Sequence, residues 1–169
     1  MADSNQRHGT AEICDLHPNS VQVLRSSLIS YGGSSRCSGQ IVTFHLNEDN
    51  RALKSRLQGP GNGCVAVVDV SGDICAVVGD RLAGFAVENC WAGIIVKGYL
   101  RDTNKLRTMP IGIWALGTYP RRSAKKDDGA TDIPISFGGV QFASGAYLYA
   151  DEDGIVVADK ELEDVSFAI

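Results

Sequence analysis

The stretch from residue 74 to residue 96 constrains the fold more than any other part of the sequence. An apolar run, Ile74–Val78, is followed by a helical pattern over Asp80–Cys90 and by a second apolar run, Ala92–Val96. A strand, a helix and a strand in such close succession are typical of a βαβ unit, in which the two strands are parallel and lie in one sheet. The sequence therefore predicts an α/β domain built on a parallel sheet.

The other predicted elements surround this unit. Residues 10–30 predict one or two short helices that are broken at Pro18, and the glycine- and serine-rich residues 31–40 predict a loop. Residues 48–58 carry two leucines four apart on a charged background, which is typical of a surface helix. Alternating or unbroken apolar runs predict further strands over residues 41–46, 64–70, 111–118, 133–140, 147–149 and 155–158.

The length and composition suit one domain. A chain of 169 residues can bury a single core, and its 44% hydrophobic and 21% charged residues are usual for a globular protein. The polar start, residues 1–9, lacks the apolar stretch of a secretory signal, and we expect a frayed terminus before a single domain over residues 10–169. Because the apolar runs stay well short of about 18 residues, we expect no membrane-spanning segment.

The cysteines and the net charge bear on the compartment and the partners. Five cysteines are spread widely without a C-x-x-C pair, so zinc-knuckle and dithiol motifs have no support, and free thiols fit a reducing cytosol. The formal charge of −4 and the pI near 5.3 argue against a nucleic-acid binder, which usually presents a basic surface. We therefore predict a cytoplasmic protein that does not bind nucleic acid directly.

Two strand ends carry the candidate chemistry. Gly79-Asp80 stands where a predicted strand gives way to a helix, and backbone N–H groups at such a start form a site for a carboxylate or a phosphate. Arg101-Asp102 follows the next strand. Parallel neighbours bring their carboxyl ends to the same edge of a sheet. We therefore expect an anion-binding helix start, an arginine and two carboxylates in one crevice.

These residue types match a metal-assisted reaction on an acid. Mg²⁺ takes oxygen ligands and is often held by only one or two carboxylates, with water and substrate completing its shell. Arg101 can make a forked contact with a carboxylate or an enolate oxygen. The local sequence also allows a structural explanation, in which Asp102 caps a helix that begins at Thr103. On the local pattern by itself, that structural explanation is the stronger of the two.

The spacing of these residues resembles a known signature. Asp80, twenty intervening residues and Arg101-Asp102 match the D-x20-R-D pattern of class II 4-hydroxy-4-methyl-2-oxoglutarate aldolases, which are similar to RraA, the regulator of ribonuclease E activity A. The resemblance covers nearly the whole chain, in segments at residues 10–15, 38–43, 88–94, 111–116, 137–140 and 148–155. Because so many segments agree, the chain is identified by resemblance as RraA-like.

The resemblance implies a fold, an assembly and a site. The fold is α/β, a swivelling β/β/α domain with stacked β layers and helices, assembled as a homotrimer or a hexamer with an active site between subunits. In that site Asp102 would bind the metal, directly or through its waters, and Arg101 would hold the carbonyl side of the substrate. Asp80 would hydrogen-bond to metal-bound water. The substrate carboxylate would be gripped by the backbone amides of Gly79, Asp80, Arg81 and Leu82.

The implied activity is that of a 2-oxo acid lyase that depends on Mg²⁺, Mn²⁺ or another divalent cation. A 2-oxo acid chelates the metal through its carboxylate and 2-carbonyl oxygens, and cleavage of the C3–C4 bond leaves an electron pair that becomes a pyruvate enolate. One site would then serve as aldolase and as oxaloacetate decarboxylase, releasing either a carbonyl compound or CO₂. The hydroxyl proton of an aldol substrate has two candidate acceptors, metal-bound hydroxide and a carboxylate, and the sequence does not distinguish between them.

The acidic turn near the end of the chain is a further candidate. The longer aldolases of this kind continue beyond a segment such as Glu161–Ile169 and contribute another acid from the neighbouring subunit. Asp151, Glu152 and Asp153 are the candidates to replace that acid. An acidic turn in water is the interpretation that we favour for them.

The basic cluster Arg121–Lys126 has three interpretations. It could receive the distal carboxylate of a dicarboxylic substrate, touch RNA, or form a solvated loop of mixed charge. Asp127 and Asp128 follow it directly and balance part of its charge. We therefore favour the solvated loop.

A function of another class also fits the resemblance. RraA proteins are non-catalytic regulators that bind and inhibit an RNA-degrading enzyme, which would give this chain a ribonuclease partner. A regulator does not need Asp80, Arg101 and Asp102, and RraA regulators can lack the aspartate after the arginine, which is present here. These residues therefore favour the lyase. The methyltransferase that older family names suggest has no support, because Gly79-Asp80 lacks the G-x-G pattern of a cofactor turn.

Overall fold

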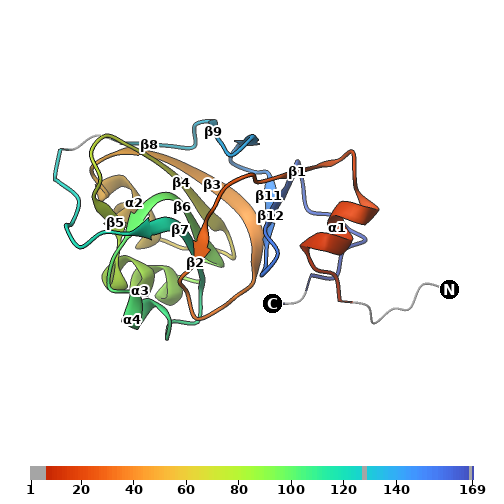
Figure 1. Ribbon diagram of the computed structural model, residues 1–169, viewed down its shortest axis with the longest axis horizontal. Coiled ribbons are helices and arrows are strands. Elements are labelled where there is room, and N and C mark those ends of the chain that lie inside the picture. Colours follow the sequence, from red (N-terminus) through yellow and green to blue (C-terminus); the bar gives the residue numbers. More distant parts are fainter. Residues whose placement is uncertain (1–6, 127–128, 168) are drawn as a thin grey trace.

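The computed structural model describes residues 7–126, 129–167 and 169 (Figure 1). Its helices are Thr10–Leu16 (α1), Arg51–Leu57 (α2), Asp80–Glu88 (α3) and Thr103–Leu106 (α4). Its strands are Val21–Val23 (β1), Ile29–Ser30 (β2), Cys37–Asn47 (β3), Val65–Ser71 (β4), Ala76–Val78 (β5), Gly93–Leu100 (β6), Gly112–Thr118 (β7), Gly129–Thr131 (β8), Ile135–Phe137 (β9), Val140–Phe142 (β10), Tyr147–Ala150 (β11) and Ile155–Ala158 (β12). None of the helices in these ranges has the length and apolar content that crossing a membrane requires.

Two β layers share one long strand, β3. Residues 37–40 of β3 pair antiparallel with β11, and β12 and β1 extend this antiparallel layer. Residues 41–47 pair parallel with β4, which is followed by β6 and β7 in parallel and by β2 at the edge. β5 lies parallel to the end of β6. The parallel layer therefore contains the predicted βαβ unit, β5-α3-β6, and that prediction is confirmed.

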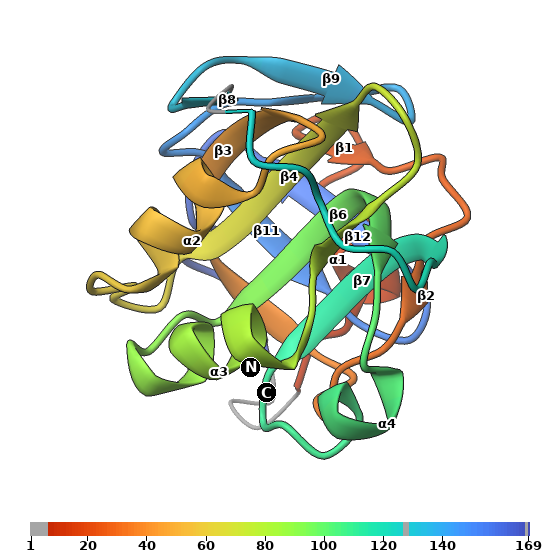
Figure 2. The ribbon, with the colours of Figure 1, turned by 90° about the vertical axis from the view of Figure 1, so that its left-hand side faces the viewer.

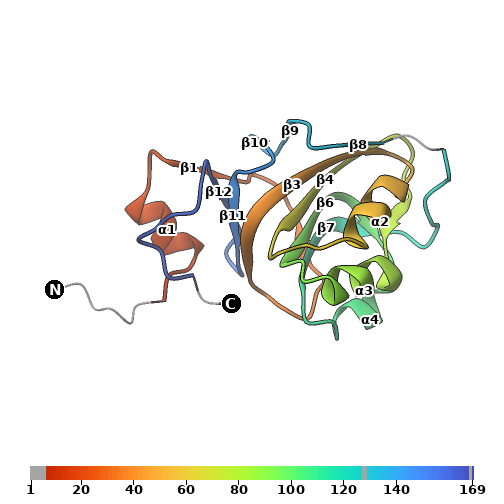
Figure 3. The same ribbon diagram turned by 180° about the vertical axis from the view of Figure 1, so that it is seen from behind.

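The parallel layer has a core on each of its faces, because successive side chains of a strand point to opposite sides. Val42 and Ala66 belong to the core against α2 and α3, whereas Ile41 and Val65 belong to the core against β11 and β12. Figures 2 and 3 show α2, α3 and α4 on one side of the parallel layer and the antiparallel layer on the other. α1 covers the far face of the antiparallel layer with the buried Ile13. The predicted α/β fold with stacked β layers and helices is confirmed.

The segment after α1 differs from the prediction. Val21–Val23 pairs with β12 and Ile29–Ser30 pairs with β7, so the helix predicted for this segment is wrong. Leu24 and Leu28, which have helical spacing, pack instead against the core between the two β layers. Backbone pairing with strands that lie far along the chain decides the conformation here, and the local pattern does not contain that information.

Two other boundaries also differ. The loop predicted over residues 31–40 ends early, because β3 already begins at Cys37. The strand predicted over residues 133–140 is a hairpin of β9 and β10, with Gly138 and Gly139 at φ of +57° and +76° in its turn. Glycine adopts positive φ without the steric penalty of a Cβ atom, which is why the chain reverses at this point.

The N-terminal prediction falls partly outside the described residues. We predicted a frayed segment over residues 1–9, of which residues 1–6 lie outside the structure's description. His8 forms a parallel β-bridge with Phe167, and the Gly9 carbonyl accepts the first hydrogen bond of α1, from Ile13 N–H at 3.1 Å. The two chain ends are therefore joined by backbone pairing directly before α1.

Candidate active site

Three chain segments leave the parallel layer at one edge. Val78, the last residue of β5, is paired with Leu100 at the end of β6, and Leu100 is paired with Thr118 at the end of β7. The backbone stays paired one residue further, since Arg101 N–H donates to Val78 O at 3.0 Å and Tyr119 N–H donates to Leu100 O at 3.0 Å. Parallel pairing therefore brings the start of α3, the Arg101-Asp102 pair and the end of β7 together.

The residues predicted from the sequence line one pocket at this edge. Its wall is formed by β5 and the start of α3, and by Arg101 and Asp102 beyond β6. Asn50 and Arg122 complete the wall. All of the predicted site residues are among those that line the pocket: Gly79, Asp80, Arg81, Leu82, Arg101 and Asp102.

Asp102 does not serve the helix that follows it. Asp102 occupies the N-cap position of α4, but its side chain makes no capping hydrogen bond, so the structural explanation by capping is wrong. Its backbone is left-handed, with φ of +64°, a conformation that aspartate tolerates better than most residues. The carboxylate instead reaches toward α3, with Oδ2 at 3.4 Å from the Asp80 N–H group. It is therefore a carboxylate presented to the pocket rather than used by its own helix.

Gly79 makes this approach possible. A Cβ atom on Gly79 would lie 2.6 Å from Asp102 Oδ2, which is closer than real Cβ contacts. Gly79 is also the N-cap of α3, in an extended conformation, so the first N–H groups of the helix have no partners within the helix. Such groups favour an anion. The glycine therefore lets a carboxylate and an anion-binding helix start share one pocket.

Arg101 lines two neighbouring pockets. Its Nη1 donates to Pro120 O at 3.4 Å, and its Nε lies 3.8 Å from Asp102 Oδ2. It lines both the pocket at α3 and a second hollow toward Tyr119 at the end of β7. Its side chain is 42% exposed, which leaves guanidinium N–H groups accessible to a ligand.

Lys105 is a member of the site that the sequence analysis missed. Its ammonium donates a hydrogen bond to Asp80 Oδ2 from α4. This hydrogen bond lowers the pKa of Asp80 and raises the pKa of Lys105, so both groups are charged at neutral pH. Lys105 lies three residues after Asp102, on the helix predicted to begin at Thr103. This spacing was the sequence feature that could have indicated that Lys105 belongs to the site.

Arg81 and Leu82 contribute in different ways. The side chain of Leu82 is buried in the core, so Leu82 offers the pocket its backbone. Arg81 is exposed. Asn50, which precedes α2, donates from Nδ2 to Val77 O at 2.8 Å and so fixes the wall of the pocket on the β5 side. The sequence gives no motif around Asn50 that could have identified it.

The donor atoms of the pocket suit a hard divalent cation. Asp80 and Asp102 offer carboxylate oxygens, and Mg²⁺ is commonly held by one or two such groups together with water and substrate. Among the residues that the structure describes, no three His, Cys, Asp or Glu side chains come together, so these residues form no closed site of the zinc type. The residues present therefore fit an open, oxygen-rich Mg²⁺ or Mn²⁺ site.

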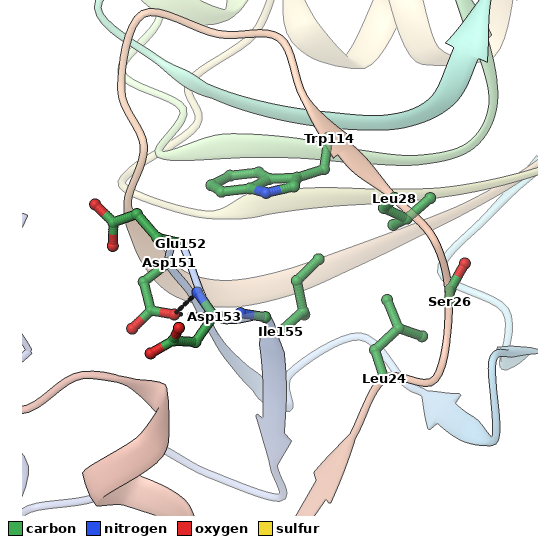
Figure 4. Close-up of a pocket in the computed structure, with 9 residues that line it drawn as sticks. Leu24, Ser26, Leu28, Trp114, Asp151, Glu152, Asp153 and Ile155 are labelled. Atoms are coloured by element: carbon green, nitrogen blue, oxygen red, sulfur yellow. Dashed lines mark hydrogen bonds between the residues drawn. The ribbon is translucent and has the colours of Figure 1, made fainter.

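The acidic turn at residues 151–153 is a separate feature (Figure 4). Asp151 is buried, so the interpretation as an acidic turn in water is wrong for this residue. Its carboxylate accepts hydrogen bonds from Thr10 N–H at 2.7 Å and Thr10 Oγ1 at 2.6 Å, which tie α1 to the turn. Glu152 is exposed, and hydrogen bonds from Ser35 and Arg36 lower its pKa to about 2. The turn borders a pocket with apolar side chains, including Trp114.

Comparison with known proteins places the chain in a family. The model of the RraA-like family, described as Aldolase/RraA, matches residues 10–157. A protein of Aromatoleum aromaticum named "Putative 4-hydroxy-4-methyl-2-oxoglutarate aldolase" is 46% identical over 154 residues, covering 90% of this chain and 97% of that protein. A protein of Pseudomonas syringae pv. tomato with the same name is 41% identical, covering 90% and 95%.

Solved structures agree in fold. The RNA-processing inhibitor RraA from Thermus thermophilis superimposes with a TM-score of 0.89 at 36% identity, covering 96% of this chain and 99% of that one. A structure from Geobacillus kaustophilus, described as an S-adenosylmethionine: 2-dimethylmenaquinone methyltransferase, gives a TM-score of 0.87 at 43% identity, covering 92% and 97%. The match of the family model and the sequence identity to these relatives, together with the shared fold, lead to one conclusion: the chain belongs to the RraA-like family.

Proposed function

We propose that the protein is a divalent-metal-dependent 2-oxo acid lyase. Its reaction is the cleavage of a 4-hydroxy-2-oxo acid, such as 4-hydroxy-4-methyl-2-oxoglutarate, or the decarboxylation of oxaloacetate, in each case with formation of a pyruvate enolate. One observation carries the proposal: the Asp102 carboxylate does not cap α4 but stands at the start of α3, beside Arg101 and Asp80. The aldolase names of the relatives from Aromatoleum and Pseudomonas support the same activity.

In this proposal the cation is Mg²⁺ or Mn²⁺, and Asp102 holds it. When bound, the cation supplies a Lewis acid that polarises the 2-carbonyl group of the substrate. Asp80 stands beside Asp102 and would accept hydrogen bonds from water that the bound cation holds. The ion pair with Lys105 keeps Asp80 ionised and so available as an acceptor, because it lowers the pKa of that carboxyl.

The protein groups divide the work on the substrate. The N–H groups at the start of α3 have no backbone acceptor within the helix and bind the 1-carboxylate, because a helix start favours an anion. Arg101 donates to the 2-carbonyl oxygen, where negative charge develops when the C3–C4 electron pair moves toward the carbonyl. The hydrogen bond from Arg101 to Pro120 O holds the guanidinium next to Asp102 before substrate arrives. Such fixed donors stabilise the enolate without reorganisation during the reaction.

The regulator stays a second candidate. The likeness to the Thermus RNA-processing inhibitor at 36% identity over nearly the full length of both chains supports it. A regulator would act through protein contacts with an RNA-degrading enzyme. Its activity would therefore be independent of Arg101 and Asp102, in contrast to the lyase.

The proposal includes an assembly and a location. We propose a homotrimer or a hexamer with the site near a subunit boundary, as the resemblance to this family implies. Light scattering would distinguish multiples of the 18.0 kDa chain. A cytosolic location is supported by the cysteines, since Cys14, Cys37, Cys64, Cys75 and Cys90 are free thiols.

Pyruvate release by the purified protein tests the lyase. The substrates are oxaloacetate and 4-hydroxy-4-methyl-2-oxoglutarate, each with Mg²⁺ or Mn²⁺ and with EDTA. We expect metal-dependent turnover that is lost in Arg101→Ala and Asp102→Ala and retained in Asp159→Ala, an exposed aspartate away from the pocket. Turnover that survives Asp102→Ala would contradict the proposed site. If pyruvate release does not exceed that caused by the metal alone, the regulator becomes the first candidate.

A further inference from the structure

The segment after β7 is fixed against β5 by its backbone. Ala76 N–H donates to Arg121 O at 2.8 Å, and Ser123 N–H donates to Ala76 O at 3.0 Å. These bonds form a parallel bridge in which Ala76 is the partner of Arg122. The described residues of the basic cluster are largely exposed and irregular, as expected for a solvated loop of mixed charge, but this one bridge fixes residues 121–123 beside the pocket.

The bridge separates the two arginines of the cluster. Neighbouring residues of an extended chain direct their side chains to opposite sides. Arg122 lines the pocket that contains Asp80, Arg101 and Asp102, whereas Arg121 is not among the described residues that line it. The sequence offers two adjacent arginines, and the fold selects one of them for the site.

The position of Arg122 suits the far end of a ligand. Its partner Ala76 precedes Gly79 by three residues, which corresponds to about 10 Å along a strand. The start of α3 and Arg101 account for one carboxylate and the carbonyl of a 2-oxo acid. Arg122 and the start of α3 line the same pocket, so the two ends of a short dicarboxylic acid can be bound at these two places.

The charge of Arg122 is available to a ligand. Asp80 is already paired with Lys105, and Asp102 stands beside Arg101. Within the described ranges, the guanidinium of Arg122 is exposed and no carboxylate of the chain pairs with it. Guanidinium matches a carboxylate with two parallel hydrogen bonds, which a lysine cannot reproduce. Asp127 and Asp128 lie outside the described residues.

The structure assigns to Arg122 the binding of the distal carboxylate of a dicarboxylic 2-oxo acid, an assignment that rests on the proposed lyase function. Arg122 is then a specificity-determining residue. It favours a substrate with a second carboxylate over one in which a methyl group replaces that carboxylate. It contacts the part of the substrate that does not react, so it contributes to binding in the ground state and the transition state alike.

A matched pair of substrates tests the assignment. 4-Hydroxy-4-methyl-2-oxoglutarate and 4-hydroxy-4-methyl-2-oxopentanoate differ only in a carboxylate or a methyl group at C4. For Arg122→Ala we expect KM for the dicarboxylic acid to rise about 10-fold to 100-fold, the loss expected for charge-assisted hydrogen bonds, with kcat nearly unchanged. KM for the monocarboxylic acid stays the same. Arg122→Lys retains part of the preference, and Arg121→Ala, the neighbouring control, behaves as the unsubstituted protein.

Binding of acids that cannot be cleaved separates this assignment from the lyase proposal. Titration calorimetry with Mg²⁺ would compare 2-oxoglutarate with 2-oxopentanoate. We expect the unsubstituted protein to prefer 2-oxoglutarate and Arg122→Ala to lose that preference. If no substrate is cleaved but the preference is lost in Arg122→Ala, the lyase proposal fails and the binding assignment stands. If both acids bind equally or neither binds, or if Arg121→Ala has the same effect, the assignment to Arg122 is overturned.

Discussion

Two aspartates that stand within two residues of a strand end have opposite surroundings. Asp151, after β11, has a side chain that is 2% exposed, and it accepts hydrogen bonds from the N–H groups of Thr10, Asp153 and Gly154 and from the Thr10 hydroxyl. Asp102, after β6, has a side chain that is 35% exposed and faces one backbone N–H at 3.4 Å. Both carboxylate oxygens of Asp151 accept hydrogen bonds within the protein, whereas the carboxylate of Asp102 is available to bind a ligand.

The contrast separates structural from chemical roles. A carboxylate that is fully hydrogen-bonded inside the protein stabilises the fold and has little capacity to bind anything else. A carboxylate held in a defined position but poorly hydrogen-bonded adds little stability and keeps its affinity for a cation. Replacing each aspartate should therefore change a different measured quantity.

The largest expected effect is that of Asp102→Asn on activity. We expect kcat/KM for pyruvate release to fall about 1000-fold, because an amide cannot replace the charge that holds the cation. The free energy of unfolding in urea should change by less than about 0.5 kcal/mol, as is usual for exposed positions. Asp153→Asn, at the exposed part of the other turn, serves as control and should alter neither quantity. A large loss of stability in Asp102→Asn would show that Asp102, like Asp151, has a structural role.

The second effect is that of Asp151→Ala on stability. We expect the free energy of unfolding to fall by about 3 kcal/mol, because Thr10 and the backbone of the turn lose a buried, charged acceptor. Urea denaturation monitored by circular dichroism measures it. The kinetic constants of the folded fraction should stay within about twofold, since the turn lies away from the pocket at α3. A stability loss below about 1 kcal/mol would show that the buried carboxylate is dispensable.

A smaller effect is expected from Gly79→Ala. The new Cβ would displace Asp102 Oδ2, from which it would lie at 2.6 Å, and we expect Mn²⁺ affinity to fall about 10-fold in titration calorimetry. Gly84→Ala in the same helix is the matched control, because a Cβ there meets nothing within 4 Å. It should leave Mn²⁺ affinity unchanged and raise the free energy of unfolding by about 0.5–1 kcal/mol. Equal Mn²⁺ affinities in the two variants would count against the role of Asp102.

The smallest effect concerns protonation of Asp80. The hydrogen bond from Lys105 lowers the pKa of this carboxyl, so the ion pair is present at neutral pH and is lost as pH falls through the lowered pKa. In Lys105→Gln we expect the pKa of Asp80 to rise toward its ordinary value, as measured by carbon-13 NMR of the metal-free protein. Lys160→Gln, an exposed lysine elsewhere, should not change it. An unchanged pKa in Lys105→Gln would exclude the pair in solution.

The predictable parts of the structure are those defined by local pattern. The apolar runs around α3 predicted the βαβ unit, and parallel pairing then placed Gly79 and Arg101 at one edge. β1 and β2 were not predictable, because these short strands form through pairing with β12 and β7 rather than through their own composition. A local helical pattern was outweighed by those distant partners.

The same reasoning applies to individual site residues. Asp151 is buried through Thr10, which lies 141 residues earlier in the chain, so the acidic sequence around it predicted exposure. Arg122 is placed by its backbone bridge to Ala76, and no feature of the basic cluster distinguishes it from Arg121. Lys105 is near Asp102 in sequence, yet its partner is Asp80. In each case a contact distant in sequence assigns the role.

The sharing of β3 between the two layers bears on the order in which the chain folds during synthesis. The strands and helices from residue 41 to residue 118 follow one another and can build the parallel layer as they leave the ribosome. Residues 37–40 of β3 must wait for β11, and β1 must wait for β12. α1 is synthesised first, but it packs on Tyr149 and Val156 and should therefore be among the last elements to reach its native position. Until then the free end of β3 is an unpaired strand edge, the kind of surface that chaperones shield in a nascent chain.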